Sequence, residues 1–124
     1  MSEPARVFVV DDDQGMRDSL RFLLEAAGFA VETYASGPAF LEAGGAEKSG
    51  CLVTDVRMPD MNGLELHGKL MATGHQIPTI FVTAFPDRRV RDRALRAGGI
   101  CFLSKPFARD DLLGCIQSAL KQTM

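Results

Sequence analysis

Short apolar runs alternate with amphipathic segments along the whole chain. Four of the runs are rich in Val, Ile, Phe and Leu and lack regular polar positions; they cover Arg6 to Val10, Cys51 to Thr54, Thr79 to Thr83 and Ile100 to Ser104. Strands buried on both faces have this pattern, which indicates a mainly parallel sheet covered by helices. A fifth run, Ala30 to Tyr34, alternates more and is predicted to lie nearer an edge of the sheet.

The segments between these runs have apolar residues at helical spacing. They predict one helix that begins after Asp13 and is capped by Gly28, a short helix between Ser36 and Gly44, and three more at about residues 63–72, 87–97 and 109–121. Strict alternation of strand and helix implies right-handed crossovers. The predicted fold is therefore α/β, a doubly wound (βα)5 parallel sheet in a three-layer sandwich.

The composition is that of one soluble globular domain spanning residues 1–124. Hydrophobic residues make up 46% of the chain and charged residues 24%, and the formal net charge of −2 supplies no field that would draw it to nucleic acid or an anionic membrane. Met1 to Pro4 do not resemble the start of a signal peptide, and no apolar run reaches the roughly 18 residues of a membrane span. We therefore expect a cytoplasmic domain without direct contact to DNA or membrane.

The chain has three cysteines, Cys51, Cys101 and Cys115, and none of them belongs to a C-x-x-C pair. An odd number without metal-binding spacing disfavours a zinc site. We expect these residues to be small, buried and apolar, in a reducing compartment.

Polar side chains follow the predicted strands where each strand ends. Asp11, Asp12 and Asp13 come after the first strand and Asp55 after the third, Thr83 closes the fourth, and Lys105 follows the fifth. Ligands of open parallel sheets bind beyond the carboxyl ends of the strands, so we expect these groups to converge. The register of the acidic run is open by one residue. We place the functional pair at Asp11 and Asp12, because the strand ends at Val10, and assign Asp13 to the helix cap.

Carboxylates that lie this close repel one another unless a cation neutralises them. Oxygen ligands without His or Cys favour Mg²⁺, with Mn²⁺ as the alternative ion. Two acids of the first loop, Asp55 and a backbone carbonyl just after it would suffice as ligands. Lys105 and Thr83 then suit an incoming phosphoryl group, and Asp55 is the natural nucleophile.

These residues stand in motifs that resemble the receiver domain of bacterial two-component response regulators. The matching stretches are "VVDDD", "LVTDVRMPDMNGLEL", "TIFVTAF" and "AGGICFLSKPF", in order and over almost the whole chain. The resemblance implies a flavodoxin-like fold with strand order 2-1-3-4-5. "MPDMNG" and "KPF" are most similar to receivers linked to a LuxR-type helix-turn-helix output domain.

The resemblance assigns a role to each matching position. Asp55 resembles the phosphoacceptor that takes phosphate from a sensor histidine kinase. The other matches are Asp11 and Asp12 to the acidic metal pair, the carbonyl of Arg57 to the backbone metal ligand, Thr83 to the switch hydroxyl, Phe102 to the switch aromatic, and Lys105 to the family lysine. The Lys105–Pro106 bond resembles one that is cis in the family, at a cost of only about 0.5–1 kcal/mol.

The function implied is a phosphorylation-dependent switch. Such a domain is not a turnover enzyme and catalyses only its own phosphotransfer and autodephosphorylation. Phosphorylation repacks the face made by the fourth helix, fifth strand and fifth helix, which controls an output domain or partner and often forms a homodimer. Arg89, Arg91, Arg93 and Arg96 could meet Asp110 and Asp111 across such a dimer, although a solvated face is the simplest interpretation of the arginines.

Two alternatives belong to other classes. Asp11-x-Asp13 faintly resembles the nucleophile motif of haloacid-dehalogenase-type phosphatases, which normally need a longer chain and a late pair of acids. A receiver-like interaction module that never takes phosphate is the other. Each polar position also has an ordinary interpretation, because acids before a helix are usually caps and loop lysines are common; only their conjunction favours function.

Overall fold

A single parallel sheet organises the chain. The computed structural model describes residues 4–121, so residues 1–3 and 122–124 of the predicted domain, with most of the segment used for the signal-peptide prediction, lie outside the described range. The strands within it are β1 (Arg6–Val10), β2 (Ala30–Tyr34), β3 (Cys51–Asp55), β4 (Thr79–Thr83) and β5 (Cys101–Ser104), in the order β2-β1-β3-β4-β5. Neighbouring strands pair in parallel, which confirms the predicted order and class.

Helices connect the strands near the predicted positions. They are α1 (Gln14–Ala26), α2 (Gly37–Glu42), α3 (Gly63–Ala72), α4 (Arg88–Arg96) and α5 (Arg109–Lys121), with an unpredicted 3-10 turn, η1 (Gly45–Glu47). The cap of α1 was predicted one residue late, since Ala27 is the C-cap. Gly28 follows it with φ of 97°, a conformation that glycine adopts without the steric cost of a side chain.

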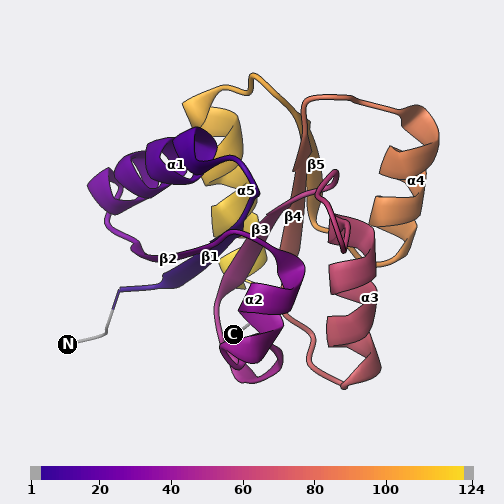
Figure 1. Cartoon of the computed structure of the whole chain (residues 1–124). Coiled ribbons are helices and arrows are strands. Elements are labelled where there is room, and N and C mark those ends of the chain that lie inside the picture. The colour runs from indigo at the N-terminus through magenta and orange to yellow at the C-terminus, as the bar shows by residue number, and fades with distance from the viewer. Residues whose placement is uncertain (1–3, 122–124) are drawn as a thin grey trace.

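Both faces of the sheet are buried, which explains why the strands show no polar alternation. Val7 and Val9 of β1 pack in the cluster with α1 and α5, while Phe8 and Val10 pack with α2 and α3. On the second face α4 adds Ala94 against Phe81. Figure 1 shows this arrangement, with α1 and α5 on one side of the sheet and the other helices opposite. The three-layer sandwich is confirmed.

The cysteines correct one expectation. Cys51 is buried and free, as predicted. A disulfide joins Cys101 on β5 to Cys115 on α5, and both residues are half-buried, so the expectation of small, buried apolar residues is wrong for these two. The packing of α5 against the sheet brings two residues that are fourteen positions apart to a Cα–Cα distance of 6.1 Å. No local spacing motif in the sequence indicates this contact.

Among residues 4–121, no helix combines the length and the apolar character that crossing a membrane requires.

Candidate functional site

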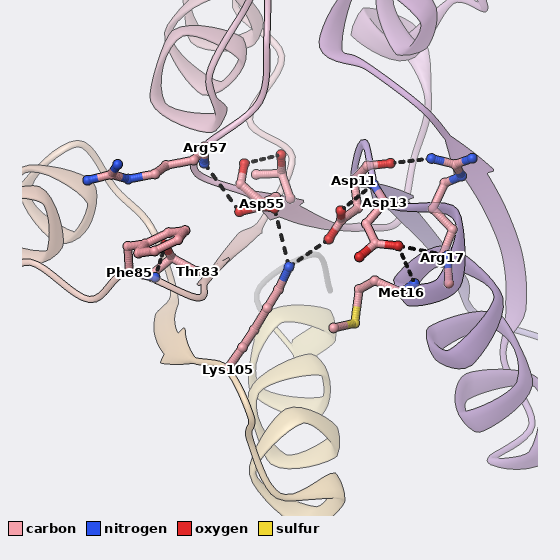
Figure 2. Close-up of polar contacts among 11 residues, drawn as sticks. Asp11, Asp13, Met16, Arg17, Asp55, Arg57, Thr83, Phe85 and Lys105 are labelled. Carbon is pink, nitrogen blue, oxygen red and sulfur yellow. Dashed lines mark hydrogen bonds and ion pairs between the residues drawn. The ribbon is translucent and has the colours of Figure 1, made fainter.

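The carboxyl ends of β1, β3 and β5 meet around the ammonium of Lys105. Its Nζ donates to Asp11 Oδ2 at 2.9 Å and to Asp55 Oδ2 at 3.2 Å. Figure 2 shows the lysine reaching up between the two acids, which come from segments far apart in the sequence. Asp11 is 1% exposed and Asp55 8% exposed, so this ion pair is shielded from most of the solvent. The predicted convergence of these three residues is present.

Asp11, Asp12 and Asp55 form a cluster that suits a metal ion. One carboxylate oxygen from each lies within 4.8 Å of the others, and Asp12 is the exposed member. An all-oxygen donor set without His or Cys fits a hard divalent cation such as Mg²⁺, which keeps several waters as further ligands. The exposed carboxylate of Asp12 leaves the cluster open to solvent on one side, where an ion with its waters can enter.

Asp13 has the structural role that we predicted for it. Its Oδ1 accepts the N–H groups of Gly15 at 2.9 Å and Met16 at 3.4 Å, and so caps the N-terminus of α1. The cap satisfies amide groups that have no partner inside the helix. Of the three consecutive acids, the first two therefore face the cluster with Asp55 and the third belongs to the helix.

Burial and charge shift the pKa values of the central pair. Burial raises the pKa of Asp55 above its ordinary value, and this effect outweighs the opposing charge of Lys105. For Lys105, burial alone would lower the pKa, but the hydrogen bond and charge of Asp11, with those of Asp55, raise it instead. The lysine is therefore a fixed positive charge, and the crowded carboxylates would gain from a second cation.

The turn after β3 packs closely against Asp55. Arg57 donates its N–H to Asp55 Oδ1 at 3.2 Å. A capping box of Asn62 and Glu65 starts α3, and Gly63 donates its N–H to the carbonyl of Val56 at 2.9 Å. A Cβ at Gly63 would collide with the carbonyl of Asp55, so this turn requires glycine. That the carbonyl of Arg57 ligates a metal stays a prediction.

Thr83 closes β4 beside the site and is 1% exposed. Its hydroxyl accepts the N–H of Phe85 at 3.1 Å, which orders the start of the loop before α4. The ring of Phe85 in turn lies beneath the guanidinium of Arg57, 5.0 Å from centroid to Cζ. The sequence analysis gave Phe85 no role. The feature that could have indicated one is a bulky aromatic residue two positions after the threonine that ends the strand.

Arg17 is a second residue that the sequence analysis missed. Its Nη1 donates to the backbone carbonyl of Asp11 at 2.7 Å, so α1 holds the acidic loop in place (Figure 2). An arginine one turn into a helix carries no signal of this contact, because the carbonyl belongs to the preceding loop. Its role is to position Asp11.

Phe102 lies away from the carboxylates, half-buried against the cluster of Val56, Phe81 and Ala94. This places it between β4 and α4, on the face of β5 opposite to Cys101. The Lys105–Pro106 peptide bond is cis, as the resemblance implied. The switch role of Phe102 stays a prediction.

The comparisons with known proteins give the class of this chain. The family "Response regulator receiver domain" matches residues 7–117, which is most of the sequence. The chain belongs to this family and is thus a signalling receiver domain rather than a conventional enzyme. This family membership does not favour the phosphatase alternative.

Several curated relatives have similar sequences. The response regulator protein TmoT of Ectopseudomonas mendocina is 43% identical over 115 residues, which are 93% of this chain and 52% of TmoT. The transcriptional regulatory protein FixJ of Bradyrhizobium diazoefficiens is 40% identical over 122 residues, or 98% of this chain and 60% of FixJ. The chain thus spans about half to three-fifths of these relatives.

Solved structures agree with the fold. The structure titled FixJ-N has a TM-score of 0.88 and 38% identity, with 97% of this chain and 96% of that chain covered. The response regulator StyR has a TM-score of 0.89 and 47% identity, with 98% of this chain and 61% of that chain covered.

Proposed function

We propose that this chain is a phosphorylation-dependent signalling switch in which Asp55 accepts a phosphoryl group from the phosphohistidine of a sensor kinase. The observation that carries the proposal is the position of Lys105 Nζ, within 3.2 Å of both Asp55 and Asp11 at the edge of a three-carboxylate cluster. Membership of the receiver family supports it.

Asp11, Asp12, Asp55 and the carbonyl of Arg57 would hold Mg²⁺, or Mn²⁺ in its place. When bound, the ion neutralises the clustered carboxylates and the charge that develops on the transferring phosphoryl group. The crowding of Asp11 and Asp55, which Lys105 alone does not relieve, supports this assignment.

The chain's own residues supply the chemistry of transfer. A carboxylate oxygen of Asp55 attacks phosphorus in line; the new O–P bond forms as the bond from phosphorus to the kinase histidine nitrogen breaks. Lys105 pairs with a phosphoryl oxygen, since its ammonium already lies at the carboxylate that becomes phosphorylated. Hydrolysis of the resulting acyl phosphate by water returns Asp55 to its starting state.

The phosphoryl group would act on Thr83 and Phe102. The added charge, about −1.5 to −2 by analogy with other phosphorylated residues, draws the hydroxyl of Thr83 away from Phe85 and toward the phosphate. Phe102, which packs against Phe81 and Ala94, then follows into the space that Thr83 vacates. This repacks the face formed by α4, β5 and α5.

Asp55→Asn tests the assignment directly, because an amide cannot accept the phosphoryl group. Acetyl-phosphate labelling should be lost in this variant and retained in Asp13→Asn, whose side chain only caps α1. Full labelling of Asp55→Asn would contradict the proposal.

The switch role of Phe102 has its own test. Beryllofluoride should move the side-chain NMR signals of Phe102, and unmoved signals would contradict that role.

Asp11→Asn separates the proposal from the phosphatase alternative. It would remove the nucleophile of a phosphatase, whereas in a receiver it weakens metal binding and leaves labelling of Asp55 at elevated Mg²⁺. An interaction module without phosphate would show no labelling in the wild type.

Calorimetry tests the metal assignment. Native protein with millimolar Mg²⁺ should show binding, and the absence of binding would contradict the assignment.

The relatives support a proposal about the physiological setting. Two observations support a helix-turn-helix output domain as the partner in a longer protein. The relatives are named as transcriptional and response regulators, and this chain covers only part of their length. We infer a cytoplasmic location, where such regulators meet DNA, and no direct binding of DNA or membrane by this domain. A reporter gene under control of the complete regulator, with and without Asp55→Asn, tests the output.

A homodimer through α4, β5 and α5 is supported by charge. Five arginines of α4 are exposed and, among residues 4–121, form no ion pair: Arg88, Arg89, Arg91, Arg93 and Arg96. Asp110 and Asp111 are exposed at the start of α5. Beryllofluoride should raise the dimer fraction in sedimentation, Arg93→Glu should lower it, and adding Asp111→Lys should restore it.

A further inference from the structure

Cys101 and Cys115 join the edge strand of the sheet to the helix that covers it. Their Cα atoms are 6.1 Å apart, a separation that a disulfide spans without backbone movement. Both residues are half-buried and so meet solvent. Cys51 differs, because it is fully buried and burial raises the pKa of its thiol to about 12. The described chain thus has one accessible sulfur pair and one shielded thiol.

The packing of α5 does not depend on the bond. Leu112, Ile116 and Ala119 are fully buried against the sheet and hold the helix to the cluster that contains Val53 and Ile80. Cys101 and Cys115 only pack against the margin of this cluster. The helix therefore keeps its apolar contacts when the sulfurs are separate thiols, and the fold is compatible with both states of the pair.

We propose that Cys101 and Cys115 are a reversible redox site whose oxidant is a small-molecule disulfide of the glutathione type. One protein thiolate attacks the small disulfide and releases one thiolate, which gives a mixed disulfide; the second protein thiolate then attacks the protein sulfur and releases the other. Two protein thiols are oxidised, one small disulfide is reduced to two thiols, and the two protons pass to the released thiolates. Excess small thiol reverses the sequence.

The bond would act on the strand that carries the predicted switch residue. Within residues 4–121, β5 is an edge strand that pairs with β4, and its residues Cys101 and Leu103 pack against the cluster that contains Leu112 and Ile116 of α5. Cys101 directly precedes Phe102, whose ring packs on the opposite face of the sheet, and the same strand leads to Lys105. Oxidation therefore ties α5 to the strand that must move if Phe102 repacks. This consequence rests on the proposed function, whereas the sulfur chemistry does not.

Peptide mapping of the wild-type chain tests the chemistry. Trypsin places Cys101 in peptide 97–109 and Cys115 in peptide 110–121, because the Lys105–Pro106 bond resists cleavage, and places Cys51 in peptide 49–57. In graded glutathione buffers, oxidising ratios should link 97–109 to 110–121 and leave Cys51 alkylated; reducing ratios should free both peptides. Peptides that stay unlinked at every ratio, or a link that includes Cys51, would overturn the proposal.

Hydrogen exchange tests the mechanical effect. Amides of α5 should exchange up to about 100-fold more slowly in the oxidised wild type than in the reduced form, because closing a loop of about 15 residues stabilises by that order. Amides of α3 should not differ. Cys101→Ala and Cys115→Ala should behave as reduced protein in both buffers, and Cys51→Ala as wild type. Equal exchange of α5 in both forms of the wild type would overturn the restraint.

Acetyl-phosphate labelling of both redox forms keeps the two proposals separate. Loss of labelling in both forms contradicts the proposed function and leaves the peptide result standing. Unlinked cysteines with normal labelling contradict only the redox site.

Discussion

The guanidinium of Arg57 lies over the ring of Phe85, 5.0 Å from its centroid, and so connects the loop after β3 to the loop after β4. Each residue is also tied to the site through its backbone, Arg57 to the carboxylate of Asp55 and Phe85 to the hydroxyl of Thr83. Both side chains are exposed, and Phe85 is 63% exposed. We therefore expect the pair to restrict the approach of water to a phosphoryl group on Asp55.

Phe85→Ala should shorten the lifetime of phosphorylated Asp55 about two- to fivefold, since an exposed cation–π contact is worth about 0.5–1 kcal/mol. The decay of acetyl-phosphate-labelled protein after removal of the donor measures it. Phe22→Ala is the matched control, because Phe22 is 78% exposed on α1 and distant in the fold from Arg57. A lifetime that Phe85→Ala leaves unchanged would show that the pair does not shield the site.

Magnesium should stabilise the fold. At 100 times its dissociation constant, an ion that binds only the folded state adds about 2.7 kcal/mol to the free energy of unfolding. Urea unfolding with excess Mg²⁺ and with a chelator should show this difference for the wild type and a smaller one for Asp12→Asn. Equal stability of the wild type in both buffers, with the same result for Asp12→Asn, would contradict a metal site at the acidic cluster.

The stability of the metal-free protein should depend on the pKa of Asp55. Burial raises this pKa above the ordinary 3.8, so the folded state binds the proton more tightly than the unfolded state. The charged carboxylate therefore costs stability, and the cost grows as pH rises from 3.8 through the folded pKa. Asp55→Asn should remove this part of the pH dependence and be more stable than wild type at neutral pH without metal. Denaturant midpoints across pH measure both effects.

Gly63 and Gly68 lie on the same helix and should respond oppositely to alanine. A Cβ at Gly63 collides with the carbonyl of Asp55, so Gly63→Ala should lower the free energy of unfolding by about 1–3 kcal/mol and reduce labelling of Asp55. Gly68 is exposed with open space around an added Cβ. Gly68→Ala should raise stability by up to about 1 kcal/mol through helix propensity. Denaturant unfolding of both variants checks the contrast.

Tyr34 is the single tyrosine of a chain without tryptophan, so its titration is visible by absorbance. Burial and the hydrogen bond from its hydroxyl to Glu32, at 2.6 Å, raise its pKa from 10.0 to about 12. Because the folded pKa is the higher one, the stabilisation is present below pH 10 and is lost between 10 and 12.

Tyrosinate absorbance of native protein should therefore appear about two pH units later than in urea. Glu32→Gln should move the folded midpoint part of the way back, since burial still acts on the ring. A native midpoint near 10 would mean that the hydroxyl is free in solution.

The candidate site was predictable because its residues stand at strand ends. Asp11, Asp55 and Lys105 each follow an apolar run, and parallel strands bring their carboxyl ends to one edge whatever the details of packing. The role of Asp13 could be distinguished from the roles of Asp11 and Asp12, because the start of a helix needs a hydrogen-bond acceptor close by in the sequence. The contacts of Arg17 and Phe85 were not predictable, because their partners lie in other segments and no spacing motif joins them.

Hydrophobic periodicity by itself determined the order of strands and helices, the burial of both sheet faces and the set of groups at the sheet edge, because each depends on residues near one another in the chain. Strand order came from the family motifs. Tertiary structure alone decided which oxygens Lys105 contacts, that Arg57 covers Phe85, and that Cys101 meets Cys115. Those contacts join segments distant in sequence, and their distances depend on how helices pack across the sheet.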